Sequence, residues 1–117
     1  MELSEIQRIQ QQVIEEMKWG RFNATQVFSH LIEELGEIVR YFLYEEEYKV
    51  KGAGHSGVDG DVGQEFAQAF NLLLQLANFA GVNLEKAWLK EREEFQKRFN
   101  PEQWQKLAEE ADKKTQI

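Results

Sequence analysis

The stretch Glu33-Glu34-Leu35-Gly36-Glu37 places three carboxylates on one long segment with helical periodicity. Apolar residues recur at helical spacing through residues 24–47, namely Val27, Phe28, Leu31, Ile32, Leu35, Ile38, Val39, Phe42 and Leu43. At about 100° per residue the three glutamates span only about 100° of the helix circumference, so they form one acidic patch. Glu34 borders the apolar stripe, where a carboxylate does not stay ionised without a partner. We therefore expect a cation at the patch, best a divalent metal ion; the alternative is a solvated face of surface acids.

The composition indicates a single all-α domain, 1–117. Pro101 is the only proline and most glycines lie between residues 52 and 63, so most of the chain is free to be helical. A formal charge of −7 argues against non-specific binding to nucleic acid or to an anionic membrane surface. The chain has no cysteine and no long apolar run, so we expect a soluble, cytoplasmic protein without disulfides.

The pattern divides the chain into five helices and one irregular segment. The expected elements are an N-terminal helix within 1–18, helices 24–47 and 62–80 joined by a flexible loop 49–63, a basic helix 84–99 and a C-terminal helix 101–113. Ser4 with Gln7, and Asn23 with Gln26, have the spacing of helix N-terminal caps. The glycine-rich loop is interpreted as a mobile flap.

Helix 62–80 carries only one charged residue, Glu65, and no lysine or arginine. Its circumference is mostly apolar, which predicts a central helix with most of its surface covered and favours an oligomer. Glu65 needs a partner from elsewhere, either a bound cation or a lysine of helix 84–99 in a structural ion pair.

If helices 24–47 and 62–80 pack antiparallel, three carboxylates converge, from Glu34, Glu37 and Glu65. Hard oxygen ligands suit Mg²⁺ or Mn²⁺, and zinc is disfavoured because cysteine is absent and His30 and His55 lack ligand spacing. Magnesium commonly bridges to phosphate oxygens, so the implied substrate carries phosphates.

These motifs resemble those of a known family. Glu33-Glu34-Leu35-Gly36-Glu37 followed by Glu65-Phe66-Ala67-Gln68 is similar to the Glu-Glu-x-x-Glu…Glu-x-x-Asp signature of the MazG-like all-α nucleoside triphosphate pyrophosphohydrolases. The similarity continues through residues 72–78, 81–87 and 90–99, and it covers the chain from about Trp19 to Phe99.

The resemblance implies a MazG-like helical bundle whose four-helix-bundle active site is completed in a homodimer or homotetramer. It also implies Mg²⁺-dependent hydrolysis of a (deoxy)nucleoside triphosphate to the monophosphate and pyrophosphate, which would serve to remove non-canonical nucleotides. Carried over by position, the metal ligands are Glu34, Glu37 and Glu65, with Glu33 as a further ligand or water-positioning base. The substrate contacts are Lys90 and Arg98 for phosphate, and Trp19, His30 and Asn71 for base or sugar.

The chain departs from the family signature at Gln68, where the family has an aspartate. An amide oxygen can still bind a metal, but the lost negative charge lowers the expected affinity. Asp61, one turn before Glu65, would compensate if the helix were continuous through it. The alternatives are a nucleotide-binding or structural homolog with lost or weak catalysis, and a phosphoribosyl-ATP pyrophosphohydrolase.

The substrate-contact residues also have simpler interpretations. His30 suits a partly buried histidine with one hydrogen-bond partner, and Trp19 suits a core or interface aromatic residue. Lys90 and Arg98 suit the exposed face of a basic helix.

Overall fold

The protein is all-α, as the sequence predicts. The computed structural model describes residues 1–58 and 60–115. Its elements are α1 (Leu3–Glu16), the short 3₁₀ turn η1 (Trp19–Arg21), α2 (Ala24–Glu45), α3 (Val62–Phe79), α4 (Leu84–Arg98) and α5 (Pro101–Thr115). Within the described ranges the only strand-like pairing is an isolated bridge between Lys51 and His55. None of these helices has both the length and the apolarity needed to cross a membrane.

The chain divides into two units, one spanning Met1–Leu84 and one starting at Glu85. In the second unit, no described residue of α4 or α5 is buried. The Phe99 ring lies against both Phe95 and Trp104, with centroids 4.7 and 6.3 Å apart, so aromatic contacts join the two helices. Asn100 caps α5 by accepting a hydrogen bond from the backbone N–H of Glu102 (2.9 Å).

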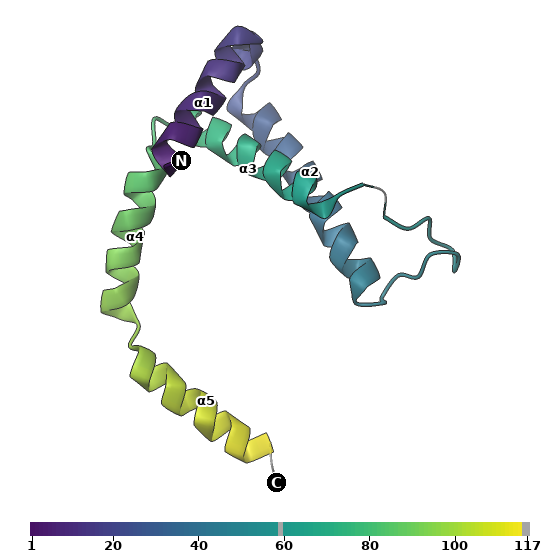
Figure 1. The fold of residues 1–117 in the computed structure, drawn as a ribbon, viewed down its shortest axis with the longest axis vertical. Helices are drawn as coiled ribbons and strands as arrows, with labels where there is room; N and C mark the ends of the chain where they lie inside the picture. The colour runs from purple at the N-terminus through teal and green to yellow at the C-terminus, as the bar shows by residue number, and fades with distance from the viewer. Residues whose placement is uncertain (59, 116–117) are drawn as a thin grey trace. The chain divides into compact units, whose positions relative to one another are not determined.

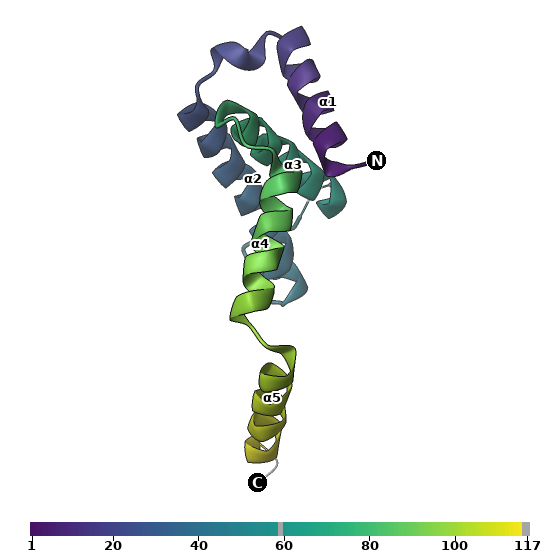
Figure 2. The ribbon, with the colours of Figure 1, turned by 90° about the vertical axis from the view of Figure 1, so that its left-hand side faces the viewer.

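The first unit is built on α2 and α3, which lie side by side (Figures 1 and 2). Leu31 and Ile38 of α2 pack with Ala69 of α3, and Leu72 and Leu76 complete this cluster. The predicted cap at the start of α2 is confirmed. Asn23 and Gln26 exchange two backbone-to-side-chain hydrogen bonds of 2.9 Å, which fixes where the helix begins.

The start of α1 differs from its prediction. The helix begins at Leu3 with Glu2 in the cap position and no side-chain cap, so the proposed Ser4–Gln7 cap is wrong. Ser4 donates instead to the side-chain oxygen of Asn83 (3.3 Å).

Gln7 is buried and links α1 to the turn that follows α3. Its amide nitrogen donates to the side-chain oxygen of Asn78 (2.9 Å) and to the carbonyl of Val82 (2.7 Å). Its amide oxygen accepts from the backbone N–H of Leu84 (2.9 Å). These partners satisfy a polar group that would otherwise be costly to bury.

The core of the first unit is small and covers only part of α2 and α3. Among the described residues, Leu74 is the one large side chain that is fully buried (0% exposed). The expectation that α3 has most of its surface covered is wrong for the single chain, because Phe66, Phe70 and Leu73 are exposed. Both helices therefore carry apolar surface beyond what they bury against each other.

Candidate functional site

Two of the predicted carboxylates, from separate helices, meet in the structure. Gln68 of α3 lies between them: with its amide oriented to suit its neighbours, its nitrogen donates to Glu34 Oε2 (3.0 Å) and to Glu65 Oε2 (3.3 Å). One amide group therefore bridges a carboxylate of α2 and a carboxylate of α3. Gln68 stands where the family signature has an acid, and it stabilises the pair by donating hydrogen bonds instead of adding a third charge.

The proximity of the acids raises the pKa of Glu65 above its ordinary value of 4.5. The main cause is the hydrogen bond that Glu65 shares with Glu34; partial burial and the charges of Glu34 and Glu37 add to it. A protonated Glu65 can donate this bond to an ionised Glu34, whereas two ionised carboxylates would repel each other. The pair is therefore a place where a proton or a cation is favoured.

Glu33 and Glu37 are more exposed than this pair. Glu37 is close enough for its charge to act on Glu65. Across residues 1–58 and 60–115, no group of three histidine, aspartate or glutamate side chains is arranged to hold a metal ion. The donors nevertheless fit a hard divalent cation, because they are carboxylate oxygens from two helices that lie close together.

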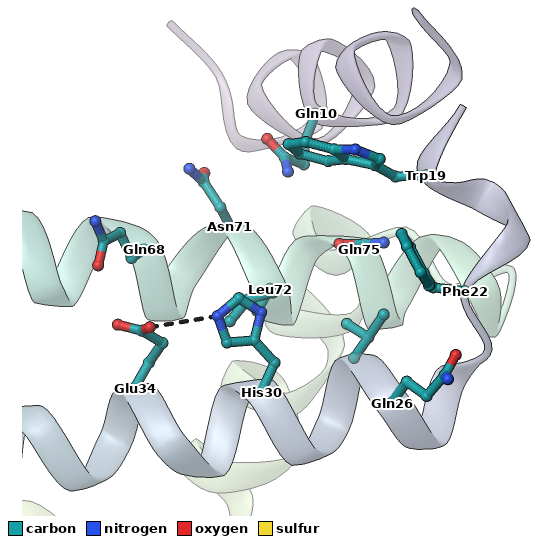
Figure 3. A pocket seen from close by; sticks show the side chains of 11 residues that line it. Gln10, Trp19, Phe22, Gln26, His30, Glu34, Gln68, Asn71, Leu72 and Gln75 are labelled. Carbon is teal, nitrogen blue, oxygen red and sulfur yellow. Dashed lines mark ion pairs between the residues drawn. The ribbon is translucent and has the colours of Figure 1, made fainter. Parts of the chain in front are cut away.

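A cavity of about 710 Å³ lies beside the carboxylate pair (Figure 3). The side chains that line it come from α1, η1, α2 and α3. They are Gln10, Trp19, Phe22, Gln26, Val27, His30, Glu34, Gln68, Asn71, Leu72 and Gln75. The cavity combines aromatic rings with amide groups. Glu34 and Gln68, which bridges Glu34 and Glu65, form part of its wall.

Three of the predicted base or sugar contacts, Trp19, His30 and Asn71, line this same cavity. His30 Nε2 lies 3.4 Å from Glu34 Oε1, one turn along α2 (Figure 3). The Glu34 side chain is only 15% exposed, whereas His30 is 56% exposed. His30 is thus an open wall residue with one acidic neighbour, which differs from the partly buried histidine considered from sequence.

The sequence did not predict that the other cavity residues would contact a ligand. Phe22 follows Trp19 closely, but it carried no separate signal. Gln75 belongs to a polar stripe on α3, and that stripe could have identified it. Gln10 and Gln26 lie on helices remote in sequence from α3, so no local pattern connects them to the cavity.

The remaining predicted residues lie elsewhere. Lys90 and Arg98 belong to α4, in the second unit. Asp61 is the N-cap of α3, in an extended conformation, and its side chain accepts from the Gly63 N–H (2.8 Å). Because α3 begins only at Val62, the condition under which Asp61 would replace the missing acid is not met.

No family model matches this chain, and comparisons with curated proteins and with solved structures also find no match. Fold and site together define an all-α protein with a carboxylate pair beside a cavity of mixed aromatic and amide character.

Proposed function

We propose that this protein hydrolyses a (deoxy)nucleoside triphosphate to the nucleoside monophosphate and pyrophosphate, with Mg²⁺ or Mn²⁺ as cofactor. The observation that supports the proposal best is the meeting of Glu34 and Glu65, from two helices, at the wall of a cavity that also contains Trp19, His30 and Asn71. The MazG-like motifs in the sequence suggest the same reaction.

Glu34, Glu65 and Glu37 would hold the metal ion. A bound Mg²⁺ supplies positive charge that neutralises phosphate oxygens near these acids. Gln68 could contribute only its amide oxygen, and its nitrogen now faces both carboxylates. Metal binding through Gln68 therefore requires a rotation of the amide that gives up two hydrogen bonds, so this position weakens the site relative to an aspartate.

The reaction needs a water molecule, an acceptor for its proton and a leaving group. Water attack on the α- or β-phosphorus forms a new P–O bond and breaks the bridging bond between the α- and β-phosphates. Glu33, which is exposed, would accept the proton from the attacking water. The products are then the monophosphate and pyrophosphate.

The cavity suits the nucleoside part of the substrate. Trp19 and Phe22 offer aromatic faces for stacking on a base. Asn71 and Gln75 offer both hydrogen-bond donors and acceptors for base or sugar edges. Base preference would be set by these amides, because stacking alone discriminates weakly between bases.

We also propose that the protein functions as a homodimer or homotetramer. Large apolar side chains are exposed along α2 and α3, namely Phe28, Ile32, Leu35, Val39, Phe42, Phe66, Phe70 and Leu73. On α2 they repeat with alternating steps of four and three residues, the spacing of a helix–helix seam. A second copy of this surface would complete a four-helix bundle and bury the exposed stripe.

The proposal is tested by measuring pyrophosphate release from canonical and modified dNTPs, and from phosphoribosyl-ATP, with Mg²⁺ or Mn²⁺. We expect release with at least one nucleoside triphosphate, and Glu65→Gln should reduce it by roughly 100-fold or more because changes even to residues that only support metal ligands cost about 10- to 100-fold. Glu16→Gln removes an exposed glutamate of α1 and should leave the rate unchanged. Absence of release from every substrate with either metal would refute the hydrolase.

A second candidate is a nucleotide-binding protein without hydrolysis. It is favoured by one observation: Gln68 already satisfies Glu34 and Glu65 with hydrogen bonds, so the acids have less need of a metal. This candidate predicts saturable nucleotide binding in calorimetry without release of pyrophosphate. Binding that persists undiminished with EDTA would support it over the enzyme.

A further inference from the structure

The loop between α2 and α3 is tied to α2 around Gly57. Arg40 Nη2 donates to the Gly57 carbonyl (2.7 Å) and to Ser56 Oγ (3.1 Å). The Gly57 N–H in turn donates to the hydroxyl of Tyr44 (2.9 Å), and Gly57 is buried. The glycine-rich segment, which the sequence suggested to be a mobile flap, thus has a defined anchor on α2.

Two basic residues, Arg40 and Lys51, contact Gly57 at this anchor. The Lys51 side chain lies against Gly57, because a Cβ built on that glycine would be 3.0 Å from Lys51 Cδ. Neither Arg40 nor Lys51 forms an ion pair with an acid in the described part of the chain. Both bonds of Arg40 use Nη2 and go to neutral oxygens. A guanidinium group has five N–H donors, so those on Nε and Nη1 are left for a further acceptor.

Arg40 also lies on the same side of α2 as Glu33 and Glu37 of the acidic patch. At about 100° per residue, Arg40 is about 60° from Glu37 and about 20° from Glu33 around the helix. Ten residues separate His30 in the cavity wall from Arg40, which corresponds to about 15 Å along the axis. Along α2 the order is therefore cavity, carboxylates, then Arg40, which pairs with no acid among the described residues. An extended nucleoside triphosphate has a comparable length. Its base, its scissile bond and its terminal phosphate would lie at the cavity, at the carboxylates and at Arg40, in that order.

We propose that Arg40, with Lys51 beside it, binds the terminal phosphate of the triphosphate substrate. This inference rests on the function proposed above and assigns the direction in which the substrate lies: base in the cavity, scissile bond over the carboxylates, and the last phosphate at the loop anchor. Planar guanidinium groups bind phosphate oxygens in pairs of hydrogen bonds, which adds to the charge attraction. The contact also selects triphosphates over monophosphates, because a monophosphate does not reach the anchor.

The test compares the binding of a dNTP and of its dNMP to the full chain by calorimetry with Mg²⁺, using the nucleotide that the wild type binds best. Arg40→Gln should weaken dNTP binding roughly tenfold or more and leave dNMP binding within about twofold of wild type. Arg40→Lys should recover part of the loss because it restores the charge without the planar fork.

Two variants separate phosphate binding from loop anchoring and from net charge. Tyr44→Phe removes the other tether of Gly57 without a change of charge, and Arg8→Gln removes an arginine of α1; both should bind dNTP as wild type does. Circular dichroism checks that Arg40→Gln keeps its helical content. If Arg40→Gln weakens dNTP and dNMP equally, or Tyr44→Phe has the same effect, the inference fails while the hydrolase proposal stands. A wild type that binds no nucleotide at all overturns both.

Discussion

The two sides of α2 are used differently, although both flank the same contact with α3. One side carries Glu33, Glu34 and Glu37, of which Glu34 lines the cavity; the other carries a row of large apolar residues that the single chain leaves exposed. The exposed fraction changes sharply between neighbouring apolar residues of α2. Leu31, which packs against α3, is 8% exposed, whereas Ile32 is 52% exposed. The apolar stripe of α2 is thus wider than α3 can cover. The homo-oligomer proposed above would give this helix a second neighbour, from another copy of the chain.

The largest expected effect distinguishes the contact of α2 with α3 from its proposed contact with a second copy of the chain. Leu31→Ala should lower the free energy of unfolding by about 2–5 kcal/mol at any protein concentration, because it opens a cavity in the α2–α3 contact. Ile32→Ala should cost little in the monomer but make the melting temperature depend more strongly on concentration, because it weakens subunit association. Thermal melts over a hundredfold concentration range, with mass measurements in solution, distinguish the two. Equal, concentration-independent losses would show that the exposed stripe has no partner.

On the acidic side, Gln68→Asp tests the site by adding an acid beside Glu34 and Glu65. We expect the dissociation constant for Mg²⁺ to fall by roughly tenfold because affinity follows the charge of the ligand set. The metal-free variant should melt at a lower temperature, since the amide bridge between Glu34 and Glu65 is replaced by repulsion. Gln12→Asp, on the exposed part of α1, controls for net charge. An unchanged Mg²⁺ dependence would show that position 68 does not face the ion.

A smaller effect follows from the raised pKa of Glu65. A raised carboxyl pKa means that the folded state holds the proton more tightly, so its stabilising contribution is complete below 4.5 and is lost as the pH rises through the raised value. Glu65→Gln keeps a neutral group at all pH values. Without metal, its melting temperature should therefore gain on that of the wild type as the pH increases from 4 upward. A difference that is constant between pH 4 and pH 8 would contradict the shared proton.

The smallest expected effect concerns the loop anchor. The Gly57 amide should exchange its hydrogen more slowly than a free loop amide, because it donates to Tyr44. Tyr44→Phe should accelerate exchange at Gly57 several-fold and leave the amide of the buried Leu74 unchanged. Exchange at Gly57 that is as fast in the wild type as in the variant would support the interpretation of the loop as a freely mobile flap.

The sequence predicted the parts of this molecule that depend on one helix or on an isolated charge. The capping pair Asn23–Gln26 acts within four residues, and Glu65 was identifiable because it is the only charge on an apolar helix. Placement of Glu34 near Glu65 needed one further assumption, antiparallel packing of the two helices.

Features that depend on distant partners could not be predicted in the same way. Gln7 has the local spacing of a cap, but it is buried because three partners near the end of α3 outcompete the helix terminus. Arg40 was not considered from the sequence, because its bonds to Ser56 and Gly57 depend on the path of the loop. Wherever a contact spans many residues of chain, helical periodicity carries no information about it.

The bonds of Gln7 also bear on the order in which this unit forms during protein synthesis. The first helix leaves the ribosome early, but the groups that satisfy Gln7 belong to residues 78–84 and emerge much later. Until then α1 has a polar side chain without its native acceptors and little apolar surface to rest on. We infer that the nascent chain assembles the α2–α3 pair first and that α1 docks onto it last.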